Sequence, residues 1–237
     1  MSARISFENC LAFINRQWTS ELSRPDGKQG GRRNVVTISR QVGSGAHAIA
    51  EQLANRLSPE TSPQAAPWTV FDRNLIEKVL EDLRLPARLA QHLPEDRASD
   101  LEDIMDDLFG MRPPSWAVVQ QTAETILRLA RLGKVILIGR GATLVTARLP
   151  NVVRIRLVAP LEQRIALVQK TRKLTAKAAA AVVQQEDRGR ARYLKKYFKA
   201  DINNPLLYHL VINTGAVSTD EAVDIIAEAL KRPVQAS

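Results

Sequence analysis

The feature that most limits what this chain can fold into is a β-branched run that leads directly into a glycine-rich turn. Residues 35–38 read Val-Val-Thr-Ile, and residues 43–45 read Gly-Ser-Gly. After the turn, apolar residues recur every four positions from Ile49 to Leu57, which is the spacing of one helical face. Strand, glycine turn and helix in this order open a βαβ unit, so the sequence predicts a parallel sheet.

Short apolar runs alternate with helical patterns along the rest of the chain. The expected strands are 35–38, 68–71, 135–138, 152–158 and 210–212. The expected helices are 46–57, 75–83, 115–132, 161–170, 175–198 and 219–230, with Ser115 and Ser218 as N-caps. This alternation predicts the α/β class: a doubly wound, mainly parallel five-stranded sheet with a helical lid and an insert.

Charge and loop composition suggest how the chain is divided. Residues 1–33 read as an N-terminal helix and linker, and 34–237 as one α/β domain. Within it, 84–114 is expected to form an acidic insert and 171–200 a basic lid region. Net charge is +9, and residues 161–200 hold eleven Lys and Arg against three acids. Such a block is typical of a nucleic-acid surface, a lid that closes on phosphates, or a solvated helical face.

Cysteine content and hydropathy bear on the compartment. Cys10 is the only cysteine, so the chain forms no internal disulfide, which fits a reducing compartment. No apolar run approaches the length that spans a bilayer. We therefore expect a cytoplasmic protein without a membrane partner; the sequence does not indicate the oligomeric state.

The segment Ser39–Gly45 is suited to hold phosphate. Glycines let backbone N–H groups curve around an anion, and the following helix adds a favourable dipole. A tight turn without a ligand would have the same composition. In a doubly wound sheet ligands bind beyond the carboxyl ends of the strands. The other candidates at strand ends are Asp72, Arg73, residues 139–141, Asn213 and Thr214.

Five motifs follow one another in an order that points to a known family. They are VTISRQVGSG (36–45), FDRNLI (71–76), VILIGRGA (135–142), DRGRA (187–191) with Tyr193, and LVINT (210–214). Together they make residues 34–230 resemble the cytidylate kinase-like family of P-loop nucleoside monophosphate kinases. The resemblance implies ATP-dependent phosphorylation of a (d)CMP-like acceptor, with Mg²⁺ accompanying ATP.

The resemblance also implies roles for individual residues. The donor phosphates would be held by Ser39, Arg40, Gly43, Ser44 and Gly45, and the donor base would lie beside Asn213 and Thr214. The acceptor would contact Asp72, Arg73 and Arg140. Arg140, Arg188 and Arg190 would be the catalytic residues, the last two as lid arginines over the transferring phosphoryl group. Arginine suits this task because its planar fork binds two oxygens and stays charged.

The glycine turn departs from the standard P-loop pattern. The first glycine position is Arg40, the lysine position is Ala46, and neither His47 nor Ala48 supplies a hydroxyl group for magnesium. No protein metal ligand is therefore predicted. Arg40 could supply the missing positive charge, which is a hypothesis.

Two further substitutions bear on the metal and on the acceptor base. Strand 135–138 ends in Ile138 where an acid is common, and Gly141 stands where cytidylate kinases have aspartate. A non-catalytic nucleotide-binding module thus remains an alternative to the kinase. A third reading is a nucleic-acid-binding protein. It is disfavoured because the aromatics of the basic block, Tyr193, Tyr197 and Phe198, fall at helical spacing suited to core contact.

Overall fold

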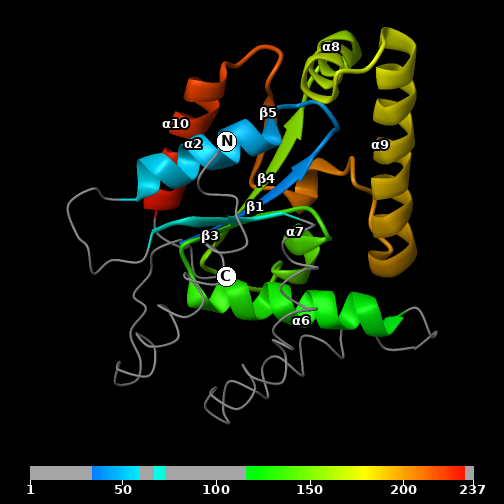
Figure 1. Ribbon diagram of the computed structural model, residues 1–237. Helices are drawn as coiled ribbons and strands as arrows, with labels where there is room; N and C mark the ends of the chain where they lie inside the picture. Colours follow the sequence, from blue (N-terminus) through cyan, green and yellow to red (C-terminus); the bar gives the residue numbers. More distant parts are fainter. Residues whose placement is uncertain (1–33, 59–66, 73–115, 233–237) are drawn as a thin grey trace, which may run out of the picture.

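The computed structural model describes residues 34–58, 67–72 and 116–232, which form a three-layer α/β structure (Figure 1). Its centre is a five-stranded parallel sheet in the order β2-β3-β1-β4-β5. The strands are β1 (Val35–Arg40), β2 (Thr69–Phe71), β3 (Val135–Ile138), β4 (Val152–Val158) and β5 (Leu210–Asn213). β1 is the middle strand, with Val35 paired to Val135 on one side and to Val152 on the other.

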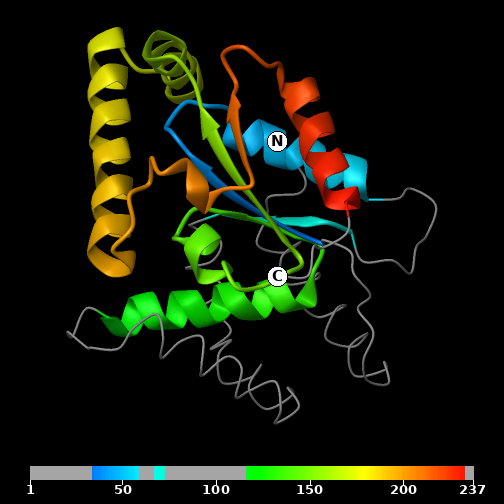
Figure 2. The ribbon, with the colours of Figure 1, turned by 180° about the vertical axis from the view of Figure 1, so that it is seen from behind.

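Helices cover both faces of this sheet. The described helices are α2 (Ala46–Leu57), α6 (Trp116–Leu132), α7 (Ala142–Val145), α8 (Leu161–Arg172), α9 (Ala176–Phe198), α10 (Thr219–Lys231) and the 3-10 turn η1 (Pro205–Leu207). α2 and α10 lie side by side on one face, and α6 with α7 covers the other (Figures 1 and 2). Alternate β1 residues, Val36 and Ile38, enter the core beneath α2 and α10. On the opposite face, buried Thr37 bonds to Thr143 of α7.

α8 and α9 form a helical hairpin at the edge of this sandwich, hereafter the α8–α9 hairpin (Figure 1). It has a small hydrophobic cluster of its own, separate from the main core. The fully buried members are Val42, Val168, Ala179 and Val183. Val42 belongs to the glycine turn, so the hairpin packs on that turn through an apolar side chain.

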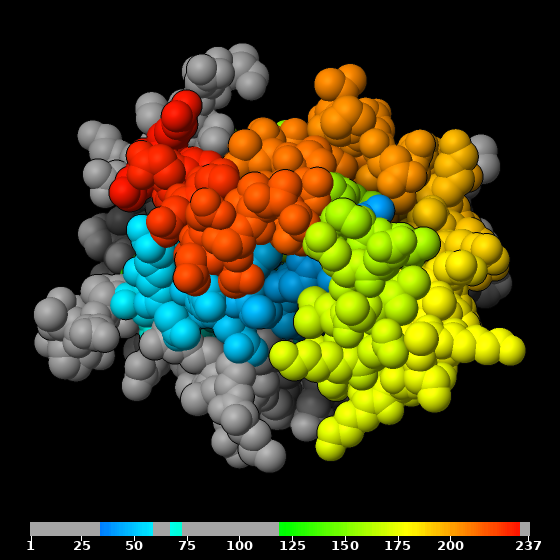
Figure 3. All heavy atoms as spheres, turned by 90° about the horizontal axis from the view of Figure 1, so that it is seen from above, coloured from blue at the N-terminus to red at the C-terminus, as the bar shows by residue number. Residues whose placement is uncertain are grey.

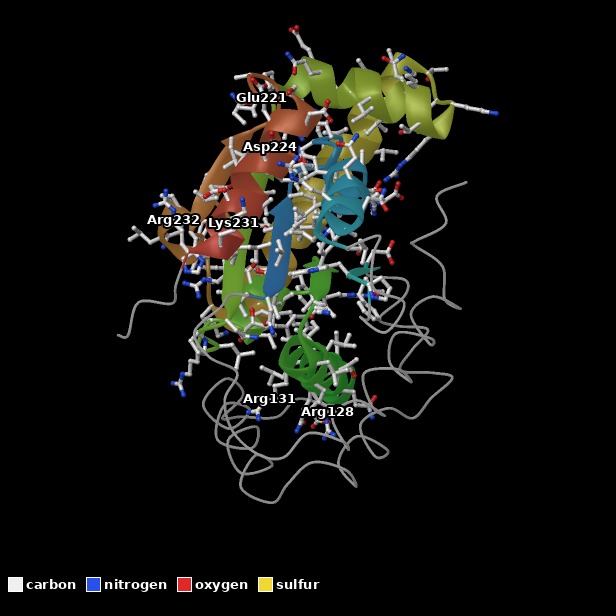
Figure 4. The ribbon with its side chains drawn as sticks, turned by 90° about the vertical axis from the view of Figure 1, so that its left-hand side faces the viewer. Arg128, Arg131, Glu221, Asp224, Lys231 and Arg232 are labelled. Carbon is white, nitrogen blue, oxygen red and sulfur yellow. The ribbon has the colours of Figure 1, made fainter. Side chains whose placement is uncertain are left out.

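The sequence predicts the ends of α10 well. The Ser218 side chain accepts from the Glu221 backbone and the Glu221 carboxylate accepts from the Ser218 N–H, a complete capping box. Glu221 lies at the start of α10 and Lys231 at its other end (Figure 4), as the helix dipole favours. In the same view, Arg128 and Arg131 extend from α6 on the side away from the sheet.

The predicted sheet is confirmed in class, strand number and position. β1 and β5 extend to Arg40 and Asn213, beyond the expected ends. α7 and η1 were not predicted, because four and three residues are too few to show a periodic pattern. The predicted helix at 75–83, the Ser115 cap, the acidic insert 84–114, the segment 1–33 and Arg73 lie outside the described residues. In the described ranges, no helix has the length and apolar character needed to cross a membrane.

Candidate functional site: the glycine turn

The glycine turn joins the end of β1 to the start of α2, and its two outer glycines serve different purposes. Both have left-handed backbones, Gly43 with φ +79° and Gly45 with φ +76°. Gly43 packs against the backbone of α8, where a Cβ would come within 2.8 Å of the Arg164 Cα. A Cβ on Gly45 would meet nothing within 4 Å. Thus Gly43 is required by packing inside the protein, whereas Gly45 borders open space where a ligand can approach.

The backbone N–H groups around this space are available to an anion. Those of Gly43, Gly45 and Ala46 donate to no acceptor among the described residues. α2 has no side-chain cap, and the Ser44 hydroxyl turns inward to donate to the Gln41 carbonyl at 2.9 Å. Figure 3 shows the blue atoms of this segment set between α2, α8 and the segment before α10. A helix N-terminus with uncapped amides beside open space attracts negative charge.

Arg40 places a positive charge at the edge of this turn. Its guanidinium lies against Gly139 at the end of β3, where a Cβ would be 3.1 Å from Cζ. The side chain is partly buried, and it makes no hydrogen bond or ion pair with any described residue. Burial, and next the charge of Arg190, lower the pKa of Arg40 to about 9. The negative charges of Asp72 and Glu186 act in the opposite direction but do not offset these effects. Arg40 is therefore a largely desolvated cation with no direct ion pair to a described acid.

Asp72 and His47 lie on the side of the turn where the acceptor was predicted. Asp72 Oδ2 is 3.7 Å from His47 Nε2, and the Asp72 side chain is mostly buried. Burial lowers the pKa of His47, although the charge of Asp72 acts in the opposite direction. The sequence does not indicate this pair, because His47 lies in α2 and Asp72 follows β2, 25 residues later. The neighbouring Arg73 lies outside the described residues.

The segment between β3 and α7 brings Arg140 to the same edge of the sheet. Gly139, Arg140 and Gly141 all have positive φ, at 85°, 52° and 73°. The Arg140 guanidinium lies 5.9 Å from the centre of the Tyr193 ring of α9, within cation–π range. A Cβ on Gly141 would be 2.7 Å from the Phe198 ring. The place where cytidylate kinases have an aspartate is thus closed by an aromatic side chain.

The two predicted lid arginines differ in position. Arg190 Nη1 donates to the Arg40 carbonyl at 3.4 Å, and its guanidinium pairs with Glu186 at 3.2 Å and Asp187 at 3.5 Å. Burial lowers the pKa of Arg190. Arg188 is exposed and makes no hydrogen bond or ion pair with the described part of the chain. The structure therefore brings Arg190 to the turn and leaves Arg188 at the surface; the catalytic roles of both stay predictions.

Arg156 of β4 is a site residue that sequence reasoning missed. It is 5% exposed and donates to the Ser39 hydroxyl at 2.9 Å and to Asn203 Oδ1 at 3.4 Å. No carboxylate lies within ion-pair distance of it in the described ranges. Burial has the largest effect on the pKa of Arg156 and lowers it. Tyr208 has the next largest effect and raises this pKa; its hydroxyl lies 3.3 Å from Ser39 Oγ. The available signal was a pair of arginines, Arg154 and Arg156, in an otherwise apolar run at residues 152–158.

Thr214 supports the glycine turn, whereas Asn213 is exposed at the end of β5. Thr214 Oγ1 lies 3.1 Å from the Ser44 carbonyl and 3.2 Å from the Val158 carbonyl. The Asn213 side chain accepts from Gly215 N–H within its own turn. Thr214 therefore braces the glycine turn from β5, and the predicted contact of both residues with a donor base stays a prediction.

The described residues do not fit direct coordination of a magnesium ion. No group of three His, Cys, Asp or Glu side chains comes together in the described ranges. The hydroxyl position of a P-loop is His47, and β3 ends in Ile138 instead of an acid. Magnesium prefers oxygen ligands. Two carboxylates lie beside the turn, Asp72 and Asp187, but Asp187 is already held by the Val42 N–H and by Arg164. The expectation that Mg²⁺ accompanies ATP therefore depends on ligands supplied by the nucleotide and not on protein side chains.

Comparison with known proteins agrees with this geometry. A family model described as the cytidylate kinase-like family matches residues 35–216. The chain belongs to this family. The crystal structure of an uncharacterized protein from Eubacterium ventriosum is similar in fold, with a TM-score of 0.63 and 19% identity, over 84% of this chain and 98% of that one.

Part of the chain is also similar to a curated protein whose name is not that of a kinase. Uronate isomerase of Corynebacterium glutamicum is 30% identical over 115 residues, 48% of this chain. The chain spans about a fifth of that relative's length, 22%. The matched family model and the glycine turn make this chain a nucleotide kinase-like protein.

Proposed function

We propose that this protein transfers the γ-phosphoryl group of ATP to a nucleoside monophosphate such as CMP or dCMP. The observation that carries the proposal is the partly buried guanidinium of Arg40, which has no direct ion pair with a described residue, beside the open amides of Gly43 and Gly45. A desolvated cation without a direct ion pair is costly to the free protein. A phosphate group at the turn would supply negative charge to Arg40 and acceptors for these amides.

The proposed chemistry is positioning and charge neutralisation. Phosphoryl transfer requires two anionic groups held in line, with little covalent chemistry from the protein. The amides of Gly43 and Gly45 would hold the donor phosphates, and Arg40 would supply the charge that Ala46 lacks. Arg190 would stabilise charge that develops on the transferring group, and Arg140 would orient the acceptor phosphate. Each is an arginine or amide at the carboxyl edge of the sheet.

A non-catalytic nucleotide-binding module is the second candidate, and one observation favours it. The turn has neither the lysine nor the hydroxyl of a standard P-loop, and the described residues offer no set of metal ligands. Such a turn would bind nucleotide without accelerating transfer. In that case the free energy of ATP binding would be used for recognition alone.

The test is a panel assay for transfer together with a direct measurement of binding. ADP release would be followed with ATP, magnesium and each of CMP, dCMP, UMP, AMP and GMP, while calorimetry measures ATP affinity. The kinase proposal expects ADP release that depends on one acceptor and is lost in Arg40→Ala. ATP binding without release for any acceptor would favour the binding module, and the absence of both would refute both candidates.

The variant Arg40→Lys sharpens this assay. Lysine keeps the charge but loses the bidentate fork, so we expect partial recovery of transfer relative to Arg40→Ala. Equal transfer in wild type and Arg40→Ala would remove Arg40 from the mechanism even if the protein is a kinase.

A further inference from the structure

Val42 joins the glycine turn to the α8–α9 hairpin through both its side chain and its backbone. Its side chain is buried in the hairpin's own cluster against Val168, Ala179 and Val183. Its backbone N–H donates to Asp187 Oδ1 of α9 at 2.8 Å. One residue of the turn is therefore bound to the hairpin by apolar packing and by a charge-assisted hydrogen bond.

Asp187 is in turn held by two arginines. Arg164 of α8 donates through Nη1 to Asp187 Oδ2 at 2.6 Å and to the Val42 carbonyl at 3.3 Å, and through Nε to the Ala159 carbonyl at 3.0 Å. The Arg164 side chain is 9% exposed, so this is a nearly buried pair. Arg190 lies 3.5 Å from the other Asp187 oxygen. The carboxylate thus connects α8, α9 and the turn at one point.

The consequence concerns Arg190, which lies one helical turn beyond Asp187. Arg190 can donate to the Arg40 carbonyl only at the present distance between α9 and the glycine turn. The hydrogen bond from the Val42 N–H to Asp187 holds α9 at that distance. A second ion pair joins the two helices, with Arg172 2.5 Å from Glu186. Glu186 also pairs with Arg190, at 3.2 Å. The network therefore sets the place of an arginine that faces the proposed phosphate position, without itself occupying the amides of Gly43 and Gly45.

We propose that Asp187 and Arg164 are positioning residues that fix the α8–α9 hairpin to the glycine turn through the Val42 amide. In the free protein the Asp187 carboxylate holds the Val42 amide, while the amides of Gly43 and Gly45 stay open for phosphate. Phosphate binding and the position of Arg190 are then coupled through the turn. This inference rests on the proposed function for its effect on nucleotide, but the contact at Val42 stands on geometry alone.

Hydrogen exchange of single amides in the wild-type protein is the first test. Without ligand, the Val42 amide should be protected, whereas those of Gly43 and Gly45 exchange quickly. ATP should then protect Gly43 and Gly45. Equal exchange at Val42 and Gly43 in the free protein would overturn the proposal. Absence of ATP protection at the two glycines would contradict the proposed function and leave the Val42 contact standing.

The second test compares Asp187→Ala with a matched loss of charge, Glu162→Gln, on an exposed acid of α8. Asp187→Ala should speed exchange at Val42 and weaken ATP binding, each by about tenfold, because a buried arginine loses its counter-ion. Glu162→Gln should change neither. If Asp187→Ala fails to fold, Arg164→Lys keeps the charge but loses the fork and should still release Val42. Wild-type exchange at Val42 and wild-type ATP affinity in the folded variants would refute the positioning role.

Discussion

Arg40 should make the free protein less stable and the ATP-bound protein more stable. Folding lowers its pKa from its ordinary value to about 9. Each pKa unit is worth about 1.4 kcal/mol, so an upper limit for the cost is about 5 kcal/mol. Relaxation and water reduce such penalties, and we expect Arg40→Met to raise the free energy of unfolding by about 1–2 kcal/mol. The apolar stem of arginine is largely preserved by methionine.

ATP should reverse the order of stability, so that wild type becomes more stable than Arg40→Met. A ligand at 100 times its Kd stabilises the folded state by about 2.7 kcal/mol. Wild type should gain this amount, while Arg40→Met, which we expect to bind ATP about 100-fold more weakly, should gain only about 0.4 kcal/mol. Urea unfolding of both proteins with and without ATP measures the two differences in one assay. Arg188→Met, at an exposed arginine, is the matched control and should neither raise stability nor remove the ATP response.

The pH dependence has a defined sign. Because the folded pKa of Arg40 lies below the unfolded value, the destabilisation is complete below pH 9 and diminishes as pH rises through about 9. The stability advantage of Arg40→Met should therefore shrink between pH 7.5 and pH 10. If Arg40→Met is no more stable than wild type at pH 7.5 and responds equally to ATP, the unpaired-cation argument is wrong.

Three other predictions follow from the same geometry. Gly45→Val should lower ATP affinity by about tenfold or more in calorimetry, because the valine side chain enters the open space beside the turn. Gly189→Ala also places a side chain in open space but away from the turn, and it should leave ATP affinity unchanged. Arg190→Ala should lower turnover at least tenfold more than Arg188→Ala in the ADP-release assay; equal losses would contradict the assigned geometry. Gly141→Asp should reduce thermal stability, because Gly141 has a left-handed backbone and an added Cβ would collide with the Phe198 ring. A melting temperature equal to that of wild type would show that the ring moves aside without cost.

The sequence by itself determined the sheet and the place of the site within it. Short apolar runs such as 135–138, alternating with helical patterns, predict buried parallel strands, and the turn after 35–38 then lies at their carboxyl edge. These properties depend on local composition and on the order of elements along the chain. The prediction of Arg40 and Arg140 at that edge follows from the same order, whereas that of Arg190 came from the resemblance to the cytidylate kinase-like family.

Tertiary structure decided which charged side chains meet. Arg156 and Asp187 are ordinary charged residues in the sequence, and their partners Ser39 and Val42 lie more than 100 positions away. Helical periodicity does not say which face of α9 meets the turn, and so it did not separate Arg190 from Arg188. Burial and the cost of an unpaired charge exist only once the chain has folded, because water solvates every arginine in the unfolded state.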